Sequence, residues 1–85
     1  MRVLIPSALR SYTERSEAQA SGASLAAVLV DLDRQYAGIR FRMIDEQERM
    51  RRHMRFFVNG EATFDLRLPL RPTDEVCIVQ ALSGG

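Results

Sequence analysis

The sequence has 85 residues, of which 46% are apolar and 27% charged; this is the composition of one small soluble domain and argues against a membrane-spanning chain. Its only cysteine, Cys77, excludes an internal disulfide, and with the only histidine, His53, it cannot complete a zinc site of the usual Cys/His kind. The net charge of +1 gives no general attraction to nucleic acid. We therefore expect a cytoplasmic protein with no bound metal and with neither membrane nor nucleic acid as a partner.

The first half of the chain predicts two strands and one helix. Residues 2–6 have the composition of a short strand, which a turn follows. The polar segment 14–20 is interpreted as an edge strand that pairs with the first one. A helix is predicted over residues 25–36, with Ser24 as its N-cap and Gly38 just beyond its end. The apolar residues of this helix recur at helical spacing: Leu25, Val28, Leu29, Leu32 and Tyr36.

The second half predicts two more strands. Residues 39–54 indicate a short helical turn followed by an exposed loop. A strand is predicted over residues 55–58, closed by the turn dipeptide Asn59-Gly60. After a turn at Thr73-Asp74, the β-branched and apolar run 75–81 is typical of a central strand that is covered on both faces. This order of elements predicts an α+β fold in which one main helix crosses a mixed sheet of four to five strands.

The last two residues, Gly84 and Gly85, directly follow the predicted central strand and its short extension. At a glycine usage of about 7%, two glycines end a chain by chance in roughly 0.5% of cases. Two interpretations stay open at this point. The pair is either an ordinary frayed terminus or a flexible arm whose carboxylate threads into a narrow site on another enzyme, because glycine permits close backbone approach.

Taken together, these features resemble the ThiS/MoaD family of ubiquitin-like sulfur carriers, and the resemblance extends over nearly the whole chain. The segment Arg40–Arg55 makes the sequence longer than the short thiamine-pathway carriers and more similar to molybdopterin-synthase small subunits and cysteine-forming carriers. The residues that carry the resemblance are Val3-Leu4-Ile5-Pro6, Ser24 to Leu29 with Leu32, Tyr36-Ala37-Gly38-Ile39, Phe57-Val58-Asn59-Gly60, Asp74-Glu75-Val76 and Gly84-Gly85.

The resemblance implies a single β-grasp domain over residues 1–85, in which the first and last strands are parallel neighbours and residues 82–85 form a flexible tail. It also implies that an E1-like enzyme uses Mg-ATP to adenylate the Gly85 carboxylate, and that sulfur from a donor then yields a thiocarboxylate. The carrier itself would bind no cofactor and catalyse nothing. The residues that would enter the partner's active site are Leu82, Ser83, Gly84 and Gly85.

The destination of the sulfur has several candidates. A sulfur-accepting synthase, either a cysteine synthase or the large subunit of molybdopterin synthase, would receive it from a carrier. In the second case the chain would be the small subunit of molybdopterin synthase. Alternatively, Gly85 would modify protein lysines in the manner of ubiquitin, or the chain would be a non-covalent interaction module with an incidental tail.

Alternation along the strands predicts a docking surface for the adenylating enzyme. Neighbouring strand residues point to opposite faces, so Phe56 and Phe57 cannot enter the same core, and Val79 opposes Ile78. One set is either exposed for a partner, with Phe57 and Val79 as the candidates, or partly covered by the 40–55 loop.

The remaining residues with reactive or charged side chains are interpreted as having no catalytic role. His53 has no readable nucleophile partner, and Cys77 is expected to act as a small hydrophobe inside a strand. Asp31 and Asp33 cannot share a helix face and are interpreted as solvated charges. The segment Arg40–Arg55 has six arginines and three acidic residues, a net charge of +3, which favours a solvated loop or a partner-docking surface over RNA binding.

Overall fold

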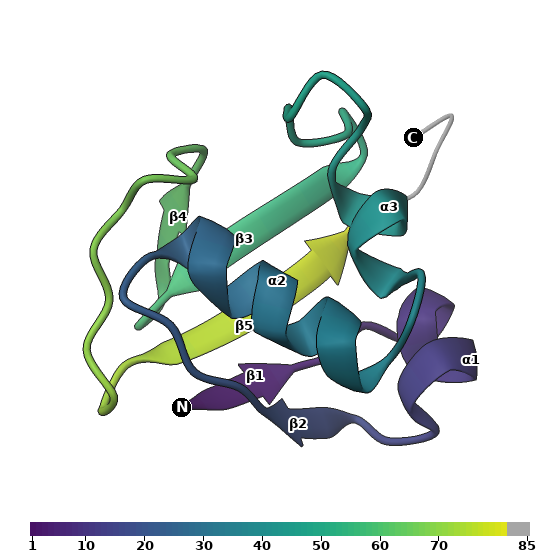
Figure 1. Cartoon of the computed structure of the whole chain (residues 1–85), viewed down its shortest axis with the longest axis horizontal. Helices are drawn as coiled ribbons and strands as arrows, with labels where there is room; N and C mark the ends of the chain where they lie inside the picture. Colours follow the sequence, from purple (N-terminus) through teal and green to yellow (C-terminus); the bar gives the residue numbers. More distant parts are fainter. Residues whose placement is uncertain (82–85) are drawn as a thin grey trace.

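A computed structural model describes residues 1–81 of the chain. The chain forms a five-stranded mixed sheet of order β2-β1-β5-β3-β4, packed against helices (Figure 1). Strands β1 and β5 are parallel, and the other neighbouring pairs are antiparallel. The elements in chain order are β1 (Arg2–Leu4), the 3-10 helix η1 (Ser7–Leu9), α1 (Arg10–Thr13), β2 (Glu17–Gln19), α2 (Leu25–Gln35), α3 (Ile39–Met43), β3 (Met54–Val58), β4 (Glu61–Thr63) and β5 (Glu75–Gln80).

The main helix α2 forms as its sequence predicts. The hydroxyl of Ser24 accepts a hydrogen bond from the backbone N–H of Ala27 at 3.2 Å, which satisfies one of the free donors at the helix start. The helix ends before Gly38, whose φ of +95° a side chain would disfavour. Its predicted apolar face packs into the core, with Leu25, Val28, Leu29 and Leu32 fully buried.

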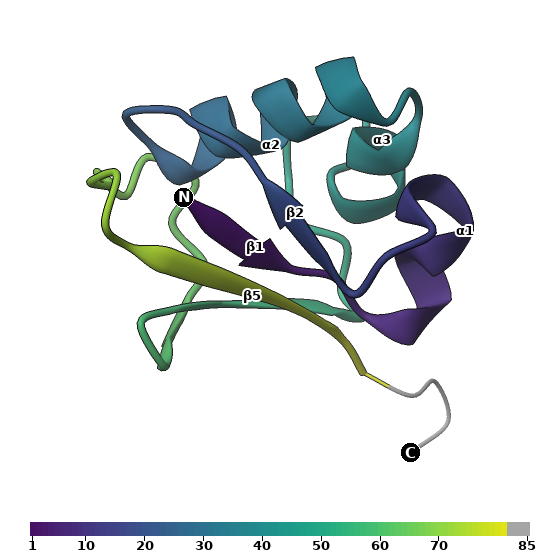
Figure 2. The ribbon, with the colours of Figure 1, turned by 90° about the horizontal axis from the view of Figure 1, so that it is seen from below.

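The helices cover only one face of the sheet. Figure 2 shows α2 and α3 along the same side of the strands. Burial alternates accordingly along β5, where Val76 and Ile78 are buried, Cys77 is half-buried and Val79 is exposed. The prediction that the last strand is central is confirmed, but the prediction that both of its faces are covered is wrong. Its apolar composition reflects one core face and one face that stays open.

The hairpin after β3 contains a strand that the sequence does not predict. The turn at Asn59-Gly60 is confirmed, and both residues have positive φ angles of 50° and 85°, which suit the twist of a two-residue hairpin. It leads into β4, whose three residues are polar or small and lie at the sheet edge. Only the pairing with β3 defines them as a strand, so composition gives little signal.

The structure also corrects the prediction of a simple turn after β1. Helices η1 and α1 occupy this connection, and they are held by the buried side chains of Leu9 and Thr13. The segment ends at Glu14, which adopts a left-handed conformation with φ of 57°. A helix of four residues is too short to display a periodic pattern.

Candidate functional site

The end of β5 is the base from which the predicted tail begins. Strand β5 is paired on both sides, with β1 and with β3, and the backbone N–H of Ala81 donates a 2.7 Å hydrogen bond to the carbonyl of His53. The chain is therefore held in register up to its last described residue. The four predicted tail residues, Leu82, Ser83, Gly84 and Gly85, lie outside the described residues.

The two predicted docking residues lie on the open face of the sheet. Phe57 is paired with Cys77, and Val79 with Arg55, across the β3–β5 ladder, so all four side chains lie on the face opposite the helices. Val79 remains 37% exposed, whereas Phe57 and Cys77 are half-buried. The alternation that separates Phe56 from Phe57 is confirmed; the role of the open face in docking stays a prediction.

Three further residues belong to this open face. Leu4 is paired with Cys77 on the other side of β5, and Ala62 is paired with Phe57. Phe64 is 69% exposed, and the guanidinium of Arg55 lies 5.8 Å from its ring centroid. Sequence reasoning missed these residues. A signal was present, because Phe64 follows Ala62 by two positions after the Asn-Gly turn, and residues two apart in a strand lie on the same face. We call this face, with its apolar residues Leu4, Phe57, Ala62, Phe64, Cys77 and Val79, the open sheet face.

A cluster of charged side chains forms the border of the open sheet face at the start of β5. Arg2 donates hydrogen bonds to Glu17 at 2.8 Å and to Glu75 at 3.0 Å. The Glu17 hydrogen bond and the charges of both glutamates raise the pKa of the Arg2 guanidinium above its usual value. The exposed apolar surface therefore lies toward the other end of β5, the end from which the tail begins.

His53, Cys77 and the helix aspartates do not come together as a catalytic group. His53 lies at the end of β5, beside Ala81, whereas Cys77 lies in the middle of the open sheet face rather than inside the core. Asp33 is more than a solvated charge, because it accepts the backbone N–H groups of Gly38 and Arg40 at 3.1 Å and joins α2 to α3.

Asp31 likewise accepts backbone and side-chain donors. It bonds the N–H of Ser21 at 3.0 Å and the Gln35 amide at 3.2 Å. Within residues 1–81, no three His, Cys, Asp or Glu side chains are arranged to hold a metal ion. No helix in the same part of the chain is long and apolar enough to cross a membrane.

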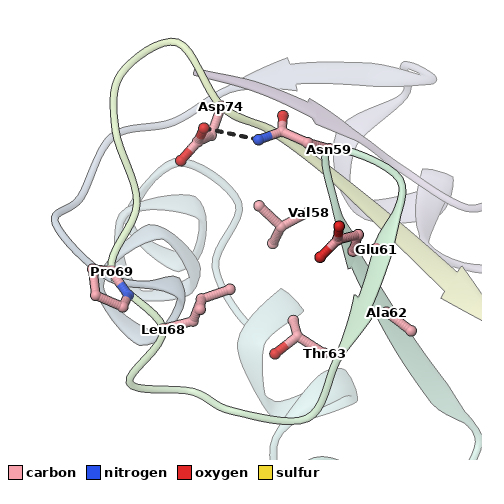
Figure 3. Close-up of a pocket in the computed structure, with 8 residues that line it drawn as sticks. All are labelled: Val58, Asn59, Glu61, Ala62, Thr63, Leu68, Pro69 and Asp74. Carbon is pink, nitrogen blue, oxygen red and sulfur yellow. Dashed lines mark hydrogen bonds between the residues drawn. The ribbon is translucent and has the colours of Figure 1, made fainter.

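The hollow between the β3–β4 hairpin and the loop before β5 has a volume of about 390 Å³ (Figure 3). The Asn59 amide donates to Asp74 at 2.9 Å across one side of it, and the backbone N–H of Arg71 donates to the same carboxylate at 2.7 Å. These two hydrogen bonds, that from Arg71 first, lower the pKa of Asp74 below its usual value. This carboxylate is therefore committed to holding the loop. The Thr63 hydroxyl in the lining accepts the backbone N–H of Asp65 and is not hydrogen-bonded to a carboxylate of the hollow.

Similarity to known proteins agrees with this geometry. A model of the ThiS family matches residues 3–85. The sulfur carrier protein CysO of Mycobacterium tuberculosis is 34% identical over 89 aligned residues, which cover 98% of this chain and 96% of that protein. A chain in the crystal structure of the Amycolatopsis orientalis BexX/CysO complex has a TM-score of 0.90 at 30% identity, covering 99% of this chain and 98% of that one.

A more distant likeness concerns the fold alone. The solution structure of small archaeal modifier protein 1 from Methanosarcina acetivorans has a TM-score of 0.82 at 24% identity, and the match covers 99% of this chain and 94% of that one. The sheet order and the single covered face are therefore those of the β-grasp fold that the resemblance to the ThiS/MoaD family implies.

Proposed function

Because the chain belongs to the ThiS family, we propose that it is a sulfur carrier loaded at the carboxylate of Gly85. The observation that carries this proposal is the full-length similarity to sulfur carrier proteins, which extends through the final glycine. The strand that leads to the tail adds support, since β5 is paired on both sides and Ala81 is bonded to His53. A rigid base of this kind limits the search that an acyl group beyond it must make to find an active site.

The proposed chemistry has two steps. The Gly85 carboxylate attacks the α-phosphate of Mg-ATP on an E1-like enzyme, which forms an acyl-adenylate and releases pyrophosphate. Hydrosulfide, delivered by a sulfur donor, then attacks the acyl carbon, and AMP departs with the oxygen to leave a thiocarboxylate. Adenylation is needed because a free carboxylate resists nucleophiles, whereas AMP is a good leaving group. The carrier supplies the acyl group and no catalytic residue.

We further propose that the adenylating enzyme docks on the open sheet face. Val79 stands two residues before Ala81, so an enzyme that covers Val79 and Phe57 also stands next to the start of the tail. Exposed apolar side chains on a sheet face opposite the helices are typical of a partner surface. The cluster of Arg2 with Glu17 and Glu75 limits the apolar surface at the far end of the sheet.

Of the possible acceptors, we propose a cysteine synthase rather than the large subunit of molybdopterin synthase. The support is that the curated relatives are sulfur carriers named CysO, at 34% identity. The solved BexX/CysO complex supports transfer between separate proteins, because its carrier is found with a second protein. Growth of a deletion strain separates the routes, since a cysteine requirement supports the first and loss of molybdenum-enzyme activity supports the second.

The decisive experiment is intact mass spectrometry after incubation with ATP, sulfide and the E1-like enzyme of the same genome. We expect a gain equal to the exchange of one oxygen for sulfur, and no gain for the chain that lacks Gly85. No gain with any such enzyme of that genome refutes the carrier function. Branched Gly-Gly peptides on target lysines in a tryptic digest would instead support a protein modifier, the second candidate that the fold permits.

A further inference from the structure

A strongly basic surface borders the base of the tail. The residues of the α3–β3 segment surround two adjoining hollows of about 280 and 410 Å³, which share Arg51 and His53. His53 is the residue whose carbonyl accepts the N–H of Ala81. We call this region the basic surface; it comprises Phe41, Arg42, Arg49, Arg51, Arg52 and His53.

The charge of the chain is concentrated here. Residues 40–55 have a net charge of +3, so the rest of the chain, within a total of +1, is negative. Arg40 is neutralised by an ion pair with Glu48. Within residues 1–81, however, Arg42, Arg49 and Arg52 form no ion pair and are exposed to solvent.

Two neighbouring arginines, Arg51 and Arg55, are fixed by hydrogen bonds and packing. The Arg51 guanidinium donates to the carbonyl of Phe41 at 2.7 Å and lies 4.6 Å from the centroid of its ring. Arg55, on the open sheet face, donates to the carbonyl of Arg52 at 2.7 Å. The Arg51 part of the basic surface is therefore preorganised, and the bond from Arg55 to Arg52 joins the surface to the proposed docking face.

We infer that the basic surface binds an acidic protein surface that surrounds the entrance to the partner enzyme's active site, and this inference rests on the proposed function. Arginine suits such a contact because its guanidinium forms paired hydrogen bonds with carboxylates. Charge complementarity accelerates encounter more than it tightens the final complex. This suits a carrier that must leave one enzyme before it serves the next.

A nucleic acid fits the basic surface less well. The Asp45 carboxylate lies within the surface, where it accepts the backbone N–H groups of Gln47 and Arg49, and Glu48 adjoins it. The Asp45 charge opposes any anionic partner, so the partner's acidic groups are expected at Arg42, Arg49 and Arg52 instead. Phe41 is the one aromatic side chain of the surface, and the Arg51 guanidinium already lies over its ring, so the surface has no set of aromatic side chains on which bases could stack.

The test measures ATP–pyrophosphate exchange by the E1-like enzyme of the same genome as the carrier concentration varies. Arg42→Glu and Arg52→Glu should each raise KM roughly tenfold at low salt and leave kcat unchanged, because they alter encounter and not chemistry. Arg71→Glu is the matched control, since Arg71 is exposed and lies before the start of β5, at the opposite end of the strand from Ala81. The difference should shrink between about 0.05 M and about 0.5 M salt.

Each alternative result is distinguishable. If Arg42→Glu and Arg52→Glu lose no more than Arg71→Glu, or if their losses do not respond to salt, the inference is overturned and the carrier function stands. Unchanged exchange together with a lost affinity for a labelled single-stranded oligonucleotide overturns it in favour of nucleic acid. A wild-type chain that no adenylating enzyme accepts refutes the proposed function itself, and the inference falls with it.

Discussion

Replacing Val79 by aspartate tests whether the open sheet face is the surface that an adenylating enzyme covers. Full burial of a valine side chain is worth about 1.5–3 kcal/mol. Val79 still exposes 37% of its surface. An enzyme that covers this exposed part gains about 1 kcal/mol, or roughly fivefold in affinity. Val79→Ala keeps the Cβ and should therefore raise KM by at most roughly that factor.

Val79→Asp should have a larger effect. It removes the same apolar contact and also puts into the interface a carboxylate that must lose its water, so we expect a cost of about 2 kcal/mol or more, or roughly a thirtyfold rise in KM. The fold should tolerate the change, because the new charge lies opposite Arg55 in the β3–β5 ladder.

Val30 offers a matched control for this experiment. It is 43% exposed on α2, on the helical side of the molecule and away from the open sheet face. Val30→Asp makes the same chemical change, and it should leave the KM of ATP–pyrophosphate exchange near that of the wild type. Thermal unfolding by circular dichroism checks that both variants fold. Equal KM values for Val79→Asp and Val30→Asp would refute docking on the open sheet face.

Three further predictions concern stability. Phe56→Ala should lower the free energy of unfolding by about 3–5 kcal/mol, since Phe56 is 1% exposed, and Phe57→Ala on the open sheet face should cost clearly less. Gly22→Ala should cost about 1–3 kcal/mol, because a Cβ there would lie 2.6 Å from the backbone nitrogen of Val28. Asp74 has a lowered pKa in the fold, so its stabilising contribution is present above its usual pKa of 3.8 and is lost as the pH falls through the lower folded value. Asp74→Asn should flatten the decline of stability in that acid range.

Urea unfolding monitored by circular dichroism measures all three. Equal losses for the two phenylalanine variants would contradict the one-sided core. A Gly22→Ala variant as stable as the wild type would mean that the close approach to α2 relaxes without cost. If Asp74→Asn loses stability below pH 3.8 as steeply as the wild type, other carboxylates dominate the acid response.

The elements predicted from sequence are those with a local signal, which is apolar spacing with a cap in α2 and strand composition in β3 and β5. Helix α2 has a regular apolar face and a serine cap, and both are found as predicted. Strand β4 and helices η1 and α1 are each only three or four residues long. They are stabilised by tertiary contacts, such as the burial of Leu9, and a local sequence pattern does not reveal such contacts.

At the candidate site, the sequence predicts which strand residues share a face. Strict alternation separates Phe56 from Phe57, and so the sequence alone identifies two faces of the strand. It cannot tell how many faces are covered, because that depends on which side the helices pack. Cys77 lies within the central strand, as expected, but its side chain is half-buried on the open sheet face. The tail residues 82–85 lie outside the described chain, and their role remains a proposal.

The parallel pairing of β1 with β5 affects when the chain can fold during its synthesis. Arg2 and Glu75 are 73 positions apart in sequence and are joined by a hydrogen bond. Strand β1 therefore lacks its central neighbour until the segment that contains β5 has left the ribosome. An enzyme that recognises Val79 on the assembled sheet accepts only chains that have completed folding. Docking on this surface would then act as quality control, since ATP is spent only on finished carriers.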